Sequence, residues 1–431
     1  MSRATVVALL VLGGCSAGDG QVAPAPAAPD TVTAVSDADA LADAGVDAPA
    51  DAAVDADADP DADADADADA DVPSPPPPPP SAPPDAWGPY PVGTKAYTFF
   101  DPVRFRWLST QVWYPSQPSG DKPTVYVGLI PGKAVTDADP DKTGAPWPTV
   151  LFSHGFKGIN AQSVGFTEYI ASHGYVVAAT NHPGNTLFDF GSKDEDVAKA
   201  SLERPKDVAF LLTALATLDP GDALSGLADL ESVAVTGHSF GGWTALIVAG
   251  GSVDVDEAEA QCAAGAPSDI FCDYLPYFPA GQVIQLDPPM AGLKAAVVLA
   301  PGGYSSIGDA ALAKIAVPTL VMGGTIDKTT PVPVEIDPIY NGLAAPRAEV
   351  VLEKADHMSY TNICAVPGAA AFIPDFCGDP TMLSGDEALP VAGAFAVAWL
   401  GYFVKGETGM LPYIQAMGAK APVATFKSSG L

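Results

Sequence analysis

The pentapeptide Gly237-His238-Ser239-Phe240-Gly241 constrains the fold of this chain more than any other stretch of it. It follows the apolar run 232–236, which suits a short buried strand, and it precedes the helix-like run 243–248. Glycine at the first and last positions suits a tight turn, because a Cβ atom there would collide with the neighbouring strand or helix. A serine at the apex of such a turn presents its hydroxyl to a base. The pattern therefore predicts a nucleophile elbow in which Ser239 is the nucleophile.

The rest of the chain from Pro91 onward shows strands that alternate with helices, which is typical of a mainly parallel sheet with both faces covered. Runs 105–114 and 124–130 are expected to form an opening antiparallel pair. The further predicted strands are 149–152, 175–179, 232–236, 295–299, 319–322 and 349–352, and the predicted helices are 166–172, 199–218, 243–248 and 389–403. This order predicts an α/β-hydrolase fold, with one catalytic domain over residues 86–431.

An insertion at about 251–292 interrupts this alternation. It is rich in Ala, Asp and Pro and follows the helix that the elbow begins. Such a segment can lie over the active site and shape what enters, or it can be a surface excursion held by a disulfide. Both interpretations stay open from the sequence.

A serine hydroxyl is a weak nucleophile unless a neighbouring base takes its proton, and a carboxylate usually orients that base. In this fold the acid follows the serine along the chain and the histidine comes last. The chain has five histidines, of which only His357 lies beyond the pentapeptide. His357 is therefore the predicted base, on a loop just after strand 349–352.

Asp327 is the predicted acid, because it follows the apolar strand 319–322 and should lie on the same rim of the sheet as the serine. Asp309, nearer the preceding strand, is an alternative. Asp356 is adjacent to the histidine, but its side chain should point away from the imidazole.

The negative charge that develops on the oxygen of an attacked carbonyl group needs hydrogen-bond donors. One is predicted to be the backbone amide of Phe240, directly after the nucleophile, and the other the amide of Phe156, in the turn after strand 149–152. His154, in the same turn, is expected to brace the loop rather than to titrate in catalysis.

The first 85 residues cannot belong to a packed core. Residues 37–71 are mostly Asp and Ala, and residues 73–84 are mostly Pro and Ser. Repeated aspartates repel one another and offer nothing to bury, and a Pro-rich run is extended, so residues 15–85 are predicted to be a disordered stalk.

Residues 1–87 hold 17 acidic residues and one basic residue, about half of the net charge of −32. The remainder is acidic too, which argues against a nucleic-acid partner.

The N-terminus has the features of an export signal. Arg3 precedes an apolar run from Val6 to Leu12, which is too short to span a bilayer but suits a signal peptide over residues 1–14. The following Gly13-Gly14-Cys15 completes a stretch that resembles a bacterial lipobox, in which Cys15 is lipidated. We therefore expect an exported lipoprotein held at a membrane by this anchor, and Ser16 favours the outer membrane or cell surface by resemblance to Gram-negative lipoproteins. An ordinary secretory signal with a chance cysteine is the alternative.

Four cysteines remain after Cys15, and an even number outside the cytosol suggests two disulfides. Of the three possible pairings, Cys262 with Cys272 and Cys364 with Cys377 requires the least rearrangement of the chain. Free buried thiols are the alternative.

Three segments together resemble the serine hydrolases that include platelet-activating-factor acetylhydrolases and bacterial predicted dienelactone hydrolases, with polyester hydrolases and chlorophyllases sharing a similar core. The segments are Phe152-Ser153-His154-Gly155, Ala171-Ser172-His173-Gly174-Tyr175-Val176-Val177-Ala178-Ala179 and Gly237-His238-Ser239-Phe240-Gly241-Gly242. The resemblance covers about residues 90–405. It implies a Ser/His/Asp esterase that acts on carboxylic esters without a metal or cofactor.

Two departures limit what the resemblance implies. In the animal acetylhydrolases the acid follows the strand directly after the elbow helix, but here the stretch 299–304 has no carboxylate, so Asp327 follows the polyester-hydrolase pattern. Genuine dienelactone hydrolases use a cysteine nucleophile, whereas this chain has Ser239. A lipase, a phospholipase A2-like enzyme, a polyester hydrolase and a catalytically idle surface lipoprotein remain alternatives, and the oligomeric state is not predicted.

Overall fold

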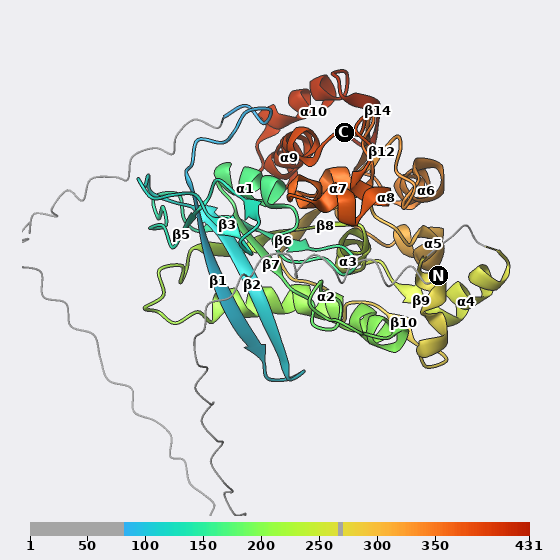
Figure 1. Ribbon diagram of the computed structural model, residues 1–431. Helices are drawn as coiled ribbons and strands as arrows, with labels where there is room; N and C mark the ends of the chain where they lie inside the picture. Colours follow the sequence, from blue (N-terminus) through green and yellow to red (C-terminus); the bar gives the residue numbers. More distant parts are fainter. Residues whose placement is uncertain (1–81, 266–269) are drawn as a thin grey trace, which may run out of the picture. The chain divides into compact units, whose positions relative to one another are not determined.

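The computed structural model describes residues 82–265 and 270–431, which belong to one compact unit (Figure 1). The predicted signal peptide, the lipidation site Cys15 and the stalk up to residue 81 lie outside the described residues. Within the two described stretches, no helix is both long enough and apolar enough to cross a bilayer.

A ten-stranded sheet organises the molecule, in the strand order β14-β13-β12-β11-β8-β6-β7-β2-β1-β5. In chain order its strands are β1 (Val92–Asp101), β2 (Arg106–Pro115), β5 (Val135–Thr136), β6 (Trp147–Ser153), β7 (Val176–Thr180), β8 (Ala228–His238), β11 (Leu293–Leu299), β12 (Thr319–Gly324), β13 (Arg347–Leu352) and β14 (Val423–Ser429). The six strands from β7 across to β13 run parallel, and β2 and β14 flank them antiparallel. This mostly parallel sheet confirms the predicted fold class.

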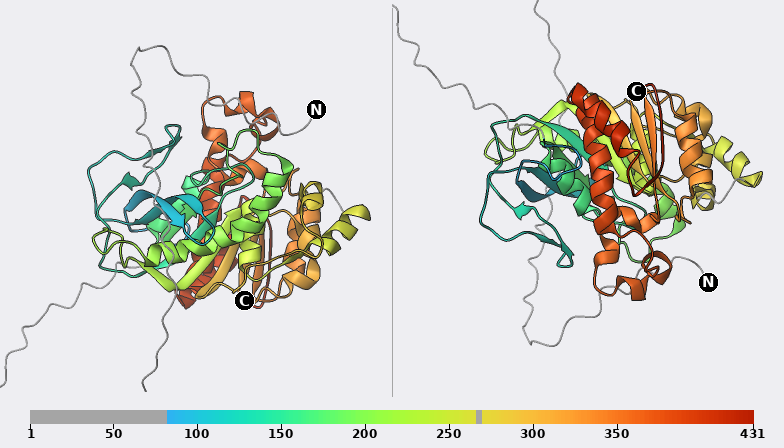
Figure 2. Two further views of the ribbon diagram at one scale, coloured as in Figure 1. Left: turned by 90° about the horizontal axis from the view of Figure 1, so that it is seen from below. Right: turned by 90° about the horizontal axis from the view of Figure 1, so that it is seen from above.

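Helices cover both faces of the sheet and create two cores (Figure 2). Successive strand residues point to opposite faces, so Phe152 joins one buried cluster and Leu151 the other. Helices α1 (Val164–Ser172), α9 (Gly385–Phe403) and α10 (Leu411–Met417) contribute to the cluster of Phe152, and α2 (Asp194–Ala216), α3 (Phe240–Val248), α5 (Tyr304–Leu312) and α6 (Asp337–Gly342) to that of Leu151. Strands covered on both sides are apolar throughout, which is why β6, β7 and β12 were recognisable in the sequence.

Short elements connect these layers. They are β3 (Val125–Tyr126), β4 (Ile130–Pro131), β9 (Val253–Asp254), β10 (Val283–Ile284), α4 (Val255–Ala263), α7 (Ala369–Phe372), α8 (Pro374–Cys377), a π-helical turn Val332–Ile336 and the 3-10 turns Ile270–Asp273, Leu275–Tyr277, His357–Tyr360, Ile363–Ala365 and Thr408–Met410. The carboxyl ends of β6, β8, β12 and β13 meet at one rim, and the turns after them carry every predicted catalytic residue.

The predicted opening pair was half wrong. β2 matches the predicted strand 105–114, but its antiparallel partner is β1 and not 124–130. In the latter stretch the chain reverses at Val127 and Gly128, both with positive φ (45° and 74°), so only the two-residue strands β3 and β4 form. Such a reversal is the geometry of a tight hairpin turn. The sequence did not predict β1, because exposed and partly buried residues alternate along much of it and it has no continuous apolar run.

Strand β14 was missed as well. It pairs with β13 at the edge of the sheet, and its residues are half-buried or exposed. An edge strand with one partner buries little apolar surface, and Lys427-Ser428-Ser429 gives it a polar sequence. The catalytic domain is therefore closed by a strand after its last helices.

The structure joins Cys262 to Cys272 and Cys364 to Cys377, which is the local pairing. The first disulfide lies inside the insertion, where it joins α4 to the 3-10 turn Ile270–Asp273, and β10 pairs back onto β9. The insertion also reaches the rim that carries the elbow, because the rings of its Tyr274 and of Phe156 stack with centroids 6.3 Å apart. Both interpretations of the insertion thus describe part of it: a disulfide holds it, and one of its side chains lies beside the predicted oxyanion loop.

Candidate active site

Ser239 occupies a sharp turn between β8 and α3. Its φ of 58° and ψ of −121° lie outside the regions that non-glycine residues ordinarily adopt. A Cβ on Gly241 would overlap the Ser153 carbonyl oxygen, and one on Gly237 would overlap the carbonyl of Gly241. The turn can therefore be this tight only with glycine at both positions. Its amide at Ser239 donates to the Leu299 carbonyl oxygen, 2.9 Å away.

Asp327 and His357 form a buried pair on the same rim. Asp327 follows β12, and His357 opens the 3-10 turn after β13. The His357 Nδ1 lies 2.9 Å from the Asp327 Oδ2, and the two residues are 4% and 5% exposed. The amides of Thr329 and Thr330 donate to Oδ1, and the Thr330 hydroxyl donates to Oδ2. Every contact holds the carboxylate facing the imidazole.

These contacts keep the carboxyl group ionised. Burial raises the pKa of Asp327, but the charge of His357 and the hydrogen bonds from His357 and Thr330 outweigh burial and lower the pKa to about 2. An ionised Asp327 accepts a hydrogen bond from the Nδ1–H of His357, so Nε2 is the ring nitrogen left to exchange a proton with another group. That nitrogen can take a proton from a serine.

His238, the neighbour of Ser239, ties the histidine loop to the elbow. Its Nε2 lies 2.9 Å from the His357 carbonyl oxygen, and its Nδ1 lies 3.0 Å from the side-chain nitrogen of Gln162. Burial, and then the charge of His357, lower the pKa of His238 to about 3. The imidazole is therefore neutral, donates through Nε2–H and accepts at Nδ1. The rings of the two histidines lie with centroids 4.7 Å apart, which places His357 next to the elbow.

The loop after β6 passes beside the nucleophile. A Cβ on Gly155 would lie 3.4 Å from the Cβ of Ser239. The Gly155 amide donates to Oε1 of Gln162, so the same glutamine contacts this loop and His238. In the described part of the chain, the amides of Phe156 and Phe240 donate to no protein acceptor. Neither predicted oxyanion donor is thus occupied by another residue of the described stretches.

Aromatic side chains from three segments lie close to one another at the elbow. The rings of Phe156 and Phe240 have centroids 6.4 Å apart, and Tyr274 of the insertion stacks on Phe156. Phe156 is 37% exposed. Phe156 therefore presents apolar surface to solvent on the loop after β6.

Comparison with known proteins places this arrangement in a family. The family model described as Chlorophyllase matches residues 125–428, which is more than half of the chain. The chain belongs to the chlorophyllase family. Among curated proteins it is similar to the cutinase est2 of Thermobifida alba, with 24% identity over 259 residues that cover 60% of each chain. It is also similar to the platelet-activating factor acetylhydrolase of Cavia porcellus, with 27% identity over 142 residues that cover 25% of this chain and 33% of that protein.

The resemblance drawn from the three sequence segments is thereby confirmed, and the cutinase match covers more of the chain than the acetylhydrolase match does. This chlorophyllase-family chain spans about 60% of the length of the first of those cutinases. Among the residues that the structure describes, no group of three or more His, Cys, Asp or Glu side chains is arranged to hold a metal ion.

Two of the predicted catalytic residues of this chlorophyllase-family chain are in direct contact, and both lie on the rim that carries Ser239. Asp327 and His357 are in contact, and His357 lies against the residue before Ser239. The rejected acids lie elsewhere: Asp309 is exposed and accepts from the Tyr304 hydroxyl, and Asp356 accepts from the backbone amide of His357 rather than from its ring.

Sequence reasoning missed Gln162 and the bridging role of His238. The position of His238 inside the pentapeptide was a usable signal, because that residue must lie beside the nucleophile. Gln162 carries no signal of its own, since a glutamine in a loop is ordinary and only the fold brings it to Gly155 and His238.

The shifted pKa of Asp327 predicts a pH-dependent stability. A carboxyl whose pKa falls from 3.8 unfolded to about 2 folded stabilises the native state above about pH 4 and loses that contribution as pH falls toward 2. The contribution is about 2 kcal/mol. We therefore expect the difference in free energy of unfolding between the parent and Asp327→Asn to be largest near neutral pH and to shrink by about this amount in acid. Urea unfolding at stepwise lower pH measures it, and a pH-independent difference contradicts the assignment.

Proposed function

We propose that this chain is a serine carboxylic-ester hydrolase in which Ser239 is the nucleophile, His357 the base and Asp327 the residue that orients the base. The observation that carries the proposal is the buried Asp327–His357 pair, which lies against His238 directly before the strained elbow serine. The names of its relatives support the reaction class, because cutinases and platelet-activating factor acetylhydrolases are similar to it.

In this mechanism the Ser239 Oγ attacks the ester carbonyl carbon while its proton passes to the Nε2 of His357. The carbonyl oxygen becomes an oxyanion, which accepts hydrogen bonds from the amides of Phe156 and Phe240. Collapse of this intermediate expels the alcohol, which takes the proton from His357, and leaves an acyl group on Ser239. Water then attacks the acyl group with the same proton transfers and releases the acid.

The aromatic side chains at the elbow indicate which substrates the site favours. Phe156, Phe240 and Tyr274 offer apolar surface next to the serine and no charged group to a substrate. Esters with apolar acyl or alcohol parts would bury surface there, so we include lipase, phospholipase A2-like and polyester-cleaving activities in the same proposal. The length of the acyl chain that is hydrolysed fastest separates these activities.

The test is hydrolysis of p-nitrophenyl acetate and p-nitrophenyl octanoate by the purified chain. We expect turnover by the parent and a fall in kcat by a factor on the order of 10⁴ or more in Ser239→Ala, because no other group can form the acyl intermediate. Asp327→Asn should lose most of the activity too, whereas Asp309→Asn, at the exposed rejected acid, should keep it.

Equal turnover in the parent and in Ser239→Ala would overturn the proposal. No turnover by the parent on either ester, or on longer esters, would favour the idle surface lipoprotein instead.

We also propose, from the sequence alone, that the chain is exported and held at the bacterial envelope by lipid on Cys15. The support is the apolar run Val6–Leu12 followed by Gly13-Gly14-Cys15. In a Gram-negative host we expect the parent in the membrane fraction and Cys15→Ala in the soluble fraction, because acyl chains supply the membrane affinity. A parent that is soluble throughout contradicts the anchor.

A further inference from the structure

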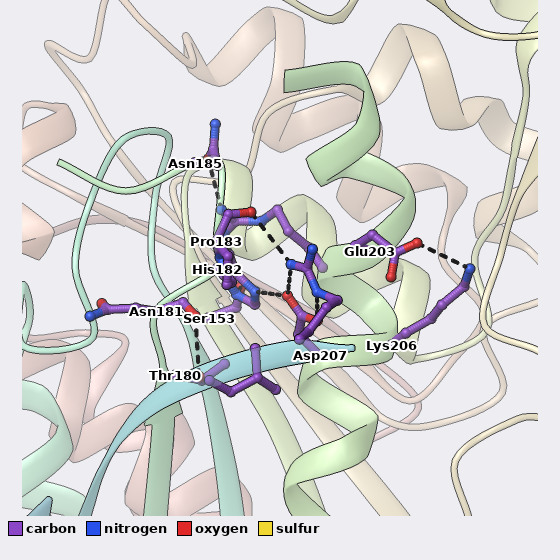
Figure 3. A network of polar contacts seen from close by, with 12 residues as sticks. Ser153, Thr180, Asn181, His182, Pro183, Asn185, Glu203, Lys206 and Asp207 are labelled. Atoms are coloured by element: carbon purple, nitrogen blue, oxygen red, sulfur yellow. Dashed lines mark hydrogen bonds and ion pairs between the residues drawn. The ribbon is translucent and has the colours of Figure 1, made fainter. Parts of the chain in front are cut away.

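A second Ser-His-Asp arrangement lies inside the molecule, away from the solvent (Figure 3). The Ser153 Oγ is 2.9 Å from the Nε2 of His182, and the Nδ1 of His182 is 3.1 Å from Oδ2 of Asp207. All three residues have no exposed surface. Ser153 ends β6, His182 follows β7, and Asp207 belongs to α2, so three elements of the fold supply the group.

This group is not a second hydrolytic centre. A substrate cannot reach a serine with no exposed surface, and the Ser153 Oγ already accepts a hydrogen bond of 3.0 Å from the guanidinium of Arg204. Arg204 is itself fully buried and donates further to Thr244 and Asn185. Burying so many polar groups costs free energy of folding unless each is paired. We therefore expect this group to have a role that offsets the cost.

Each hydrogen bond in the group has a single direction. Burial, and then the charges of Arg204, Arg106 and Arg104, lower the pKa of His182 well below its usual value, so its imidazole is neutral. Asp207 accepts hydrogen bonds from Arg104 (2.6 Å) and from Arg106 (2.8 and 2.9 Å), and it accepts a further one from the Nδ1–H of His182. The Nε2 of His182 then accepts from the Ser153 hydroxyl, whose oxygen accepts from Arg204. In this pattern the Ser153 hydroxyl and both ring nitrogens of His182 each have a partner.

His182 and Arg204 of this group contact the loop after β6, which carries the predicted oxyanion donor Phe156. The backbone amide of His182 donates to Nε2 of His154 over 3.1 Å, and Arg204 donates to the His154 carbonyl oxygen. Burial lowers the pKa of His154 well below its usual value, so His154 is neutral and donates through Nδ1 to the Gly155 carbonyl oxygen, 2.7 Å away. The two residues before Phe156 are thus held by side chain and backbone at once.

We propose that Ser153, His182, Arg204 and Asp207 form a positioning group that holds the amide of Phe156 where the oxyanion develops. The inference rests on the proposed function. Oxyanion donors act at about 2.7–3.1 Å, and a misplacement of about 1 Å can cost about 10²-fold in rate. Hydrogen bonds depend on direction, so they can fix the position of the loop 154–156 to within this distance. Apolar contacts do not depend on direction and would let the loop shift.

The test compares Ser153→Ala with Ser201→Ala in the full chain. Both serines are fully buried, but the Ser201 hydroxyl donates only to the Val197 carbonyl within α2, which makes it a matched control. For Ser153→Ala we expect kcat for p-nitrophenyl acetate to fall about tenfold, below the 10²–10³ of a lost donor, with KM within about twofold. The inhibition constant of a trifluoromethyl ketone, whose adduct places an oxyanion in the same position, should rise by the same factor.

A purely structural role would lower the melting temperature and leave kcat and the inhibition constant unchanged, and that result overturns the inference. If Ser153→Ala does not fold, His182→Gln, which also breaks the link to Asp207, carries the same comparison, and failure of both to fold likewise assigns the group to stability alone. An inactive parent overturns the proposed function and this inference with it. An active parent whose Ser153→Ala variant matches Ser201→Ala overturns the inference alone.

Discussion

The close approach of the elbow to the end of β6 is the constraint on which the site depends. The Ser153 carbonyl oxygen occupies the space that a Cβ of Gly241 would need, so the turn packs against β6 backbone to backbone. This contact holds Ser239 at positive φ and brings the loop 154–156 alongside it. The side chain of the same Ser153 enters the buried group with His182 and Arg204. Ser153 therefore packs against the elbow through its backbone and forms hydrogen bonds with His182 and Arg204 through its hydroxyl.

Neutral histidines and paired charges surround the nucleophile. His154, His182 and His238 are buried with lowered pKa values, and each has one nitrogen that donates and one that accepts. Asp327 remains ionised beside His357. Dipoles that are oriented before the substrate arrives need no reorganisation when charge develops. The polar interior thus supports a reaction that moves one proton and creates one oxyanion.

The elements that the sequence reveals best are those buried on both faces, such as β7 and β12, because their apolar runs have no other explanation. The elbow and the single late histidine could likewise be predicted, since tight turns and catalytic histidines require particular residue types. Strand β1, next to the edge strand β5, and the edge strand β14 were missed because half-buried strands carry a mixed pattern. Gln162 and the Ser153 group were out of reach, because their partners lie from 7 to 76 positions away and only the sheet order brings them together.

The most direct test of the account is to find where an alkyl fluorophosphonate attaches, because this reagent phosphonylates a serine only when a base activates it. The account predicts one adduct per chain, located by peptide mass spectrometry at Ser239, with no adduct at the buried Ser153. It also predicts that His357→Ala loses the labelling while remaining folded. An adduct on another residue, or an active chain that is not labelled at all, would contradict the claim that Ser239 and His357 are the catalytic pair.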